Sequence, residues 1–330
     1  MAYIMGVDGG GSKTYTVITN EKGILLGEGF SAGTNYQKIG LETAMTHAKQ
    51  SMEQALASAG LRYEDLSFVQ FALAGADRPI DVENLKSGLK RFPVRSWDLV
   101  CDTMAGLRTG SPGNIGVVLV CGSGTNAYGR SGTGKVVQTG GFGYLYGDFA
   151  GGNHMAVETF RAAVRSWELR DVPSELTRSV PAFFGFSSME EMLDDFLDRQ
   201  VSSVPSELTI LLHEVAERGD QLASRLLAQT GRELGMAARS VMERIGDFGV
   251  EEIPIVLVGG VFQRGKDPQL LRALKQTVYE GGRKVRFVIP NMEPVFGAVL
   301  MGMDRLNIQA GEDVIKRFNS YRRVGVGHAP

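Results

Sequence analysis

The sequence reads YIMGVDGGGSKT from Tyr3 to Thr14. The apolar run at 3–7 predicts a buried strand, and the glycines after it predict a tight turn, because glycine adopts backbone conformations closed to other residues. Successive backbone N–H groups converge in such a turn and favour an anion. We therefore predict a phosphate cradle made of Gly9, Gly10, Gly11, Ser12, Lys13 and Thr14.

An aspartate, Asp8, stands at the strand end immediately before this turn. Mg²⁺ is usually held by one or two carboxylates together with substrate phosphates and retained waters. The position predicts that Asp8 binds Mg²⁺ alongside the phosphates of ATP. The alternative is a glycine-rich hairpin turn with an ordinary surface aspartate.

The opening pattern of strand, glycine turn and strand recurs from residue 115, with strands expected at 117–121, 126–130 and 136–139. Two such turns, one in each half, are expected to grip one polyphosphate. A third glycine pair follows a strand at 255–258, where absent side chains leave room for adenosine. Neither a P-loop nor a dinucleotide fingerprint is present. The second glycine turn comprises Gly122, Ser123, Gly124 and Thr125. The third glycine element comprises Gly259, Gly260 and Val261.

A chain of 330 residues predicts two domains with a candidate site in the cleft between them. We expect an α/β fold in which 1–114 and about 312–330 form the first domain. Residues 115–311 form the second, with a helical insertion at about 155–249. The tail at 312–323 is expected to be one amphipathic helix.

The composition favours small-molecule chemistry. With 35 basic and 37 acidic residues, net charge −2, no global field would attract nucleic acid or an anionic membrane. Only two cysteines occur, which is typical of a reducing compartment. No apolar run is long enough to span a membrane and the N-terminus does not read as a signal peptide, so we expect a cytoplasmic, soluble protein.

The three glycine elements resemble the PHOSPHATE 1, PHOSPHATE 2 and ADENOSINE motifs of the superfamily of actin, Hsp70 chaperones and sugar kinases. More narrowly, the chain resembles the BadF/BadG/BcrA/BcrD ATPase family, whose best-understood branch is the N-acetylglucosamine kinases. The resemblance covers nearly the whole chain, least distinctively from about 173 to 249. It rests on GVDGGGSKT, AGTNYQKIG, FALAGADRP, CDTMAGL, VCGSGTNAYG, GGFGYLYGD and VLVGGV.

The resemblance implies two ribonuclease H-like domains that close on Mg-ATP and a sugar, in a homodimeric kinase that makes N-acetylglucosamine 6-phosphate. It implies that Asp102 is the catalytic base; from the residues alone, Asp102 could equally be the N-cap of a helix. Phe142 and Tyr144 could instead be core residues. The implied sugar-binding residues are Thr34, Asn35, Asp102, Gly141, Phe142, Gly143, Tyr144 and Asp148.

The chain departs from the kinase branch after Asp148, where Phe149-Ala150 replaces the usual Glu-Gly. The sugar therefore stays open: glucosamine, N-acetylmuramate or another hexose are alternatives, and N-acetylmuramate would call for a basic residue such as Arg78 or Arg130. Two other classes also remain. An ATPase activator of a 2-hydroxyacyl-CoA dehydratase would need two cluster-binding thiolates from each subunit, and a non-catalytic sensor would need no base.

Overall fold

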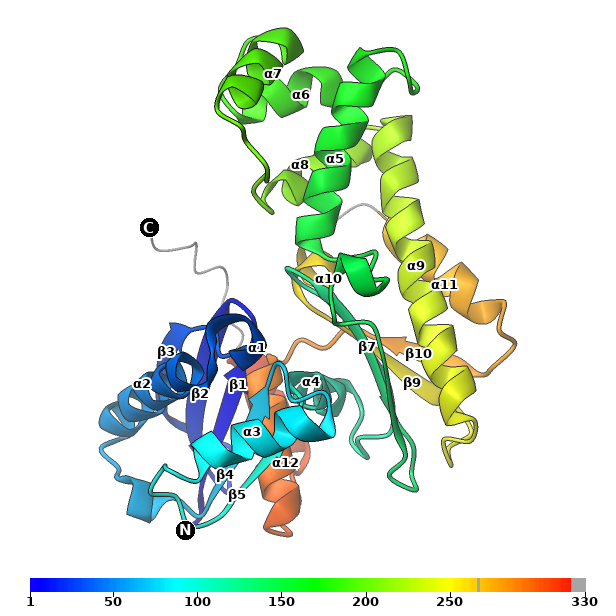
Figure 1. Cartoon of the computed structure of the whole chain (residues 1–330). Helices are drawn as coiled ribbons and strands as arrows, with labels where there is room; N and C mark the ends of the chain where they lie inside the picture. Colours follow the sequence, from blue (N-terminus) through cyan, green and yellow to red (C-terminus); the bar gives the residue numbers. More distant parts are fainter. Residues whose placement is uncertain (266–267, 322–330) are drawn as a thin grey trace. The chain divides into compact units, whose positions relative to one another are not determined.

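The computed structural model describes residues 1–265 and 268–321. The chain separates into two compact units (Figure 1). Unit 1 comprises Met1–Val118 and Val288–Pro330, and unit 2 comprises Leu119–Phe287. Each unit contains a five-stranded sheet with helices, which confirms the predicted α/β class. Among the helices of the described residues, none combines the length and apolarity needed to cross a membrane.

The sheet of unit 1 has the order β3-β2-β1-β4-β5. Its first three strands form an antiparallel meander, and β1 pairs in parallel with β4, which pairs in parallel with β5. The carboxyl ends of β1, β4 and β5 therefore meet at one edge of the sheet, where α/β proteins place their ligands. The strands are β1 Tyr3–Gly9, β2 Lys13–Asn20, β3 Leu25–Ala32, β4 Phe68–Leu73 and β5 Trp97–Val100.

Helices cover both faces of this sheet. Successive side chains of a strand point to opposite faces and so contact different helices. Met5 and Val7 of β1 belong to a core that includes residues of α2 and α3, whereas Ile4 belongs to a core with α12 and α13. The helices of unit 1 are seen in Figure 1 around the sheet. They are α1 Tyr36–Ile39, α2 Leu41–Ala59, the 3₁₀ turn Tyr63–Asp65, α3 Pro79–Leu89, α4 Asp102–Gly110, α12 Pro294–Arg305 and α13 Glu312–Ser320.

The C-terminal boundary of the second domain differs from the sequence-based one. Residues 288–311 lie in unit 1, because α12 packs directly on β1 and α4. A Cβ atom on Gly6 would lie 2.7 Å from the carbonyl oxygen of Val295, so the absence of a side chain at Gly6 permits this approach. The expected tail helix ends at Ser320, and its last predicted residues, 322–323, lie outside the described residues.

The sheet of unit 2 has the order β10-β9-β6-β7-β8. The stretch expected to be helical at about 155–249 corresponds to α5 to α9, which lie between β8 and β9 in the sequence. Helix α9 packs on α11 and on β7 and β8. The elements are β6 Gly116–Cys121, β7 Thr125–Arg130, β8 Val136–Thr139, the 3₁₀ turn Tyr144–Tyr146, α5 Gly152–Trp167, α6 Leu176–Phe183, α7 Met189–Asp198, α8 Leu208–Glu217, α9 Gln221–Ile245, β9 Ile253–Val258, α10 Gly260–Arg264, α11 Gln269–Tyr279 and β10 Val285–Val288.

Candidate active site

The first glycine turn connects β1 to β2 in unit 1. The N–H of Gly10 donates to the carbonyl of Lys13 over 2.9 Å, which closes the turn, and Ser12 and Lys13 are exposed. Thr14 is fully buried, and its Oγ1 donates to the carbonyl of Ala32 over 2.8 Å. Thr14 therefore supports the turn from beneath, while Gly10 to Lys13 form its accessible part.

The segment predicted to bind sugar lies against this turn. The N–H of Thr34 donates to the carbonyl of Gly10 over 3.0 Å. A Cβ atom on Gly9 would lie 2.0 Å from Oγ1 of Thr34, so only glycine fits there. Asn35 follows, and its Oδ1 accepts from the N–H of Gln37 over 3.1 Å as the N-cap of α1. Unit 1 thus joins the predicted phosphate turn to the predicted sugar segment.

Asp102 stands at the same edge of the sheet, two residues after β5. The N-cap of α4 is Cys101, so Asp102 is the first helical residue and not the cap. Its Oδ1 accepts from the N–H of Thr103 over 2.9 Å. Burial raises the pKa of Asp102 to about 6, and the negative charge of Asp77 acts in the same direction. A carboxylate with a pKa near neutral pH is suited to general-base chemistry.

Asp8 is partly buried at the end of β1. Burial and then the negative charge of Asp102 raise the pKa of Asp8 to about 7; Glu293 adds to this rise, and Lys13 opposes it. A bound cation would relieve this repulsion between carboxylates. Within residues 1–265 and 268–321, no three His, Cys, Asp or Glu side chains are grouped to hold a metal ion. A carboxylate beside a phosphate turn is the kind of ligand that Mg²⁺ uses, together with phosphates and waters.

Sequence reasoning left two of these acidic residues unassigned, Asp77 and Glu293. Asp77 belongs to the loop after β4, and this loop is tied to the glycine turn because the N–H of Ala74 donates to the carbonyl of Gly9 over 2.7 Å. The available signal for Asp77 was its place in the sequence, because a loop that follows a strand parallel to β1 must leave the sheet at the same edge as the loop after β1. Glu293 precedes α12, whose place in unit 1 was not foreseen.

The second glycine turn connects β6 to β7 in unit 2. The N–H of Gly122 donates to the carbonyl of Gly124 over 2.9 Å. The start of α5 is tied to the turn, since the N–H of Gly152 donates to the carbonyl of Gly122 over 2.7 Å. The hydroxyl of Thr125 donates to the carbonyl of Val120 over 3.1 Å, and Ser123 and Gly124 are exposed. The turn is therefore firmly held while its tip stays open.

The third predicted element joins β9 to α10. Gly259 has φ of +109°, and a Cβ atom there would lie 2.3 Å from the carbonyl oxygen of Cys121. Gly260 and Val261 are the first residues of α10. Unit 2 thus places the predicted adenosine element directly against the end of β6, where the second phosphate turn begins.

The loop between β8 and α5 is braced by Asp148. Its carboxylate accepts from the N–H of Gly141 over 3.0 Å and from the N–H of Gly143 over 2.6 Å. Both glycines have positive φ. Phe142 and Tyr144 are 46% and 74% exposed, so neither is a core residue in unit 2. The loop presents aromatic side chains, and Asp148 holds its shape.

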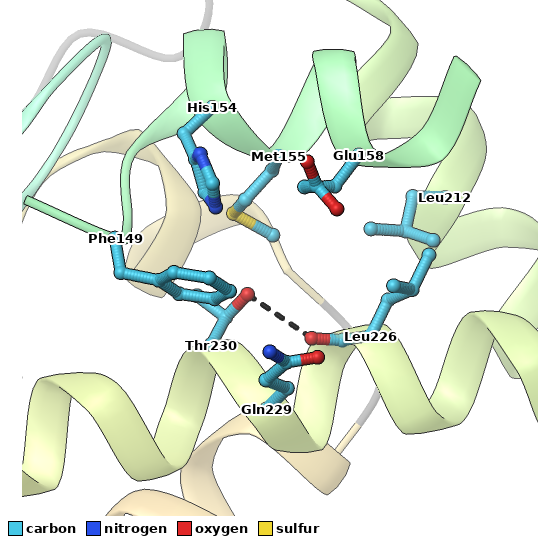
Figure 2. Close-up of a pocket in the computed structure, with 8 residues that line it drawn as sticks. All are labelled: Phe149, His154, Met155, Glu158, Leu212, Leu226, Gln229 and Thr230. Atoms are coloured by element: carbon cyan, nitrogen blue, oxygen red, sulfur yellow. Dashed lines mark hydrogen bonds between the residues drawn. The ribbon is translucent and has the colours of Figure 1, made fainter. Parts of the chain in front are cut away.

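The side chain of Phe149, the residue at which the chain departs from the kinase pattern, is directed into the pocket drawn in Figure 2. It lines a pocket between α5, α8 and α9 together with Met155 and Leu212, among others. Its ring centroid lies 4.3 Å from that of His154, whose other neighbour is the ring of Tyr144 at 5.5 Å. At this position the chain therefore has a packing residue in place of a carboxylate.

Both thiols of the sequence are buried. Burial raises the pKa of Cys121 to about 12 and that of Cys101 well above its ordinary range. Neither cysteine is a ready thiolate on the surface of its unit. This disfavours the alternative in which each subunit contributes two thiolates to a shared iron–sulfur cluster.

Two α/β units, each with a glycine-rich turn between antiparallel strands, define an actin-like ATPase fold. The structure of a putative N-acetylglucosamine kinase from Chromobacterium violaceum has this fold, with a TM-score of 0.68 at 23% identity, covering 91% of this chain and 99% of that one. The model of the BadF/BadG/BcrA/BcrD ATPase family matches residues 5–302. The chain belongs to this family, which confirms the resemblance.

Two curated relatives match nearly end to end. An N-acetylmuramic acid/N-acetylglucosamine kinase from Clostridium acetobutylicum is 24% identical over 303 residues, covering 91% of this chain and 98% of that protein. An N-acetyl-D-glucosamine kinase from Dictyostelium discoideum is 23% identical over 312 residues, covering 91% of this chain and 97% of that protein. Both are named as kinases of amino sugars.

Proposed function

We propose that this protein transfers the γ-phosphoryl group of ATP to a hydroxyl group of an amino sugar, with N-acetylglucosamine as the first candidate and N-acetylglucosamine 6-phosphate as its product. One observation carries the proposal. A carboxylate whose pKa is raised to about 6, Asp102, stands at the sheet edge where the first glycine turn lies against Thr34. The names of the two curated relatives support the choice of substrate.

In this proposal, Asp102 accepts the proton of the sugar hydroxyl while the oxygen of that hydroxyl forms a bond to the γ-phosphorus. The bond from that phosphorus to the β–γ bridging oxygen breaks, and ADP leaves. Phosphoryl transfer needs mainly positioning and charge stabilisation. The glycine turns supply N–H groups for the phosphates, with one turn in each unit. Asp8 would hold Mg²⁺, which when bound would supply positive charge to the phosphate oxygens.

The proposed sugar contacts come from Thr34 and Asn35 in unit 1 and from the loop braced by Asp148 in unit 2. Polar groups that lose their partners discriminate strongly between ligands, so these contacts are expected to set specificity. The exposed rings of Phe142 and Tyr144 are available to stack on a sugar. We also expect a homodimer, which light scattering of the purified protein tests.

N-acetylmuramate is the second candidate, because the Clostridium relative is named for both sugars. Its lactyl carboxylate would require a cation. Arg78 follows Asp77, but its Nε and Nη2 each lie 2.8 Å from an oxygen of buried Asp81. A lactyl group would have to compete with Asp81 for Arg78, and Arg130 is the other candidate cation.

The test is a coupled assay of ADP release with Mg-ATP. N-acetylglucosamine, glucosamine, N-acetylmuramate, N-acetylmannosamine and glucose are assayed in parallel. We expect stimulation by N-acetylglucosamine, lost by about 10²–10⁴-fold in Asp102→Asn. Asp194→Asn, a change in an exposed aspartate of α7, is the matched control and should leave the rate unchanged. Stimulation by none of the sugars, or full activity of Asp102→Asn, would refute the proposal.

A further inference from the structure

A buried thiol lies between two carboxylates at the candidate active site. Cys101, only 4% exposed, connects β5 to α4 as the N-cap residue. Its Sγ lies 3.4 Å from Oδ1 of Asp77 and 3.3 Å from Oδ1 of Asp102. Both distances are within hydrogen-bonding range for sulfur, and the single proton of the thiol can be donated to one of the two carboxylates at a time. The thiol therefore links the loop after β4 to the first residue of α4.

This thiol stays protonated. Its burial and the negative charges of Asp102 and Asp77 all raise the pKa of Cys101 well above its ordinary range. A thiol in such surroundings is a poor nucleophile and is not a redox-sensitive group. The role left to this thiol is that of a weak hydrogen-bond donor to a carboxylate.

The two carboxylate oxygens of Asp102 differ in their surroundings. Asp102 accepts hydrogen bonds from the N–H of Thr103 and from the thiol of Cys101, and both of these go to Oδ1. Two donors on one oxygen fix the rotation of the carboxylate and draw negative charge to that oxygen. The other oxygen, Oδ2, keeps its capacity to accept a proton.

We propose that Cys101 is a positioning residue for the phosphoryl transfer described above. Donation from its thiol and from the N–H of Thr103 fixes Oδ1 of Asp102, so that Oδ2 is the oxygen that takes the proton of the acceptor hydroxyl. Because a catalytic group must be aligned closely with the atom it acts on, a base free to rotate loses rate more than it loses binding. The inference rests on the proposed function.

Two substitutions separate hydrogen bonding from packing. Cys101→Ser keeps a donor, and Cys101→Val keeps an apolar side chain without one. We expect Cys101→Val to lower kcat by at least about tenfold at unchanged KM for ATP, and Cys101→Ser to retain most of kcat. A packing role predicts the reverse order, because a buried hydroxyl is costlier than a methyl group. Cys101→Ala replaces Cys101→Val if the valine variant does not fold. Equal activity of the donor and non-donor variants would overturn the proposal.

A double-mutant cycle shows whether Cys101 acts through Asp102. In an Asp102→Asn background, the change Cys101→Val should cause little further loss of kcat, whereas an additive loss overturns the inference. If Asp102→Asn itself is fully active, the proposed function fails. If Asp102→Asn is inactive and Cys101→Val is fully active, only the role of Cys101 fails.

A spectroscopic measurement tests the contact without any turnover. The S–H stretching band of Cys101 is isolated as the infrared difference between the wild type and Cys101→Val. We expect this band at the lower frequency of a hydrogen-bonded thiol. In Asp77→Ala, where Asp102 is the remaining acceptor, the band should stay at this lower frequency, and in the double variant Asp77→Ala/Asp102→Ala it should shift towards the free value. A band at the free value in Asp77→Ala contradicts the proposed contact with Asp102.

Discussion

The missing side chain of Gly259 is what allows β9 to end against β6, because a Cβ atom there would lie 2.3 Å from the carbonyl oxygen of Cys121. The positive φ of Gly259, +109°, is a second reason for glycine. We expect Gly259→Ala to lower Tm by at least roughly 5 °C, as measured by differential scanning calorimetry. Gly113→Ala, whose Cβ would meet nothing closer than 3.6 Å, should leave Tm unchanged. Equal Tm values for both variants would show that the backbone at Gly259 can shift to accommodate the added methyl group.

Gly124→Ala tests the second phosphate turn without disturbing the fold. A Cβ atom on Gly124 would meet no atom of the described protein within 4 Å. The same holds for Gly11 in the first turn. If these turns cradle phosphates, the added methyl group blocks the approach of the ligand, and the Kd for ATP rises at least about tenfold at unchanged Tm. Isothermal titration calorimetry checks this, and unchanged ATP affinity in both variants would exclude the phosphate role.

The fold was largely predictable because each signal for it is local. The glycine turn at Gly9 and its counterpart at Gly122 are each formed by consecutive residues, and short apolar runs predict the buried strands. Contacts between distant segments were not predictable. Thr34 against Gly9, or α12 on β1 at Gly6, depends on how complete elements pack.

The candidate site shows the same division. Asp8 and Asp102 could be proposed from strand ends and family motifs. Asp77 could not, because its role depends on the thiol that links it to Asp102. For Phe149, the sequence shows only that the carboxylate usual in the kinase branch is missing. The packing of its ring beside His154 could not be predicted, because it depends on how the helices of unit 2 pack.

Asp8 is expected to lower stability in the absence of Mg²⁺. Its pKa is about 7 in the folded protein and 3.8 in the reference state, so the folded protein holds this proton more tightly than the unfolded chain does. The folded state therefore loses stability as pH rises between about 4 and 7, and the full cost applies above about pH 7. Asp8→Asn removes this cost, because the amide carries no charge.

Thermal unfolding without Mg²⁺ checks this expectation for Asp8. The Tm of Asp8→Asn should exceed that of the wild type by at least roughly 2 °C at pH 8, and the difference should vanish near pH 4. The same variant should bind Mg-ATP more weakly, since the proposed ligand is lost. A variant that is less stable than the wild type at pH 8 would contradict the raised pKa.

The pH dependence of kcat is expected to report Asp102. A base must be deprotonated to act, and burial raises the pKa of this carboxyl to about 6. The rate of phosphorylation should therefore fall about tenfold per pH unit below about pH 6 and level off above it. Steady-state assays from pH 5 to 8 measure the profile, with the residual rate of Asp102→Asn as the control. A profile that is flat down to pH 5 would remove Asp102 as the base.

His154 is expected to hold the loop between β8 and α5 through its ring and not through hydrogen bonds. Its ring lies beside those of Tyr144 and Phe149 (Figure 2 shows His154 and Phe149). In the part of the chain that the structure describes, its buried Nε2 has no hydrogen-bond partner. His154→Phe keeps a ring and removes the unpaired nitrogen, so its Tm should equal or exceed that of the wild type.

His154→Ala removes the ring contacts and should lower Tm by at least roughly 3 °C. If the loop braced by Asp148 binds the sugar, His154→Ala should also raise KM for the sugar at unchanged KM for ATP, while His154→Phe keeps both. Calorimetry and the coupled assay measure the two effects on the same preparations. Should His154→Phe lose as much as His154→Ala, the imidazole nitrogens, and not the ring contacts, would be what holds the loop.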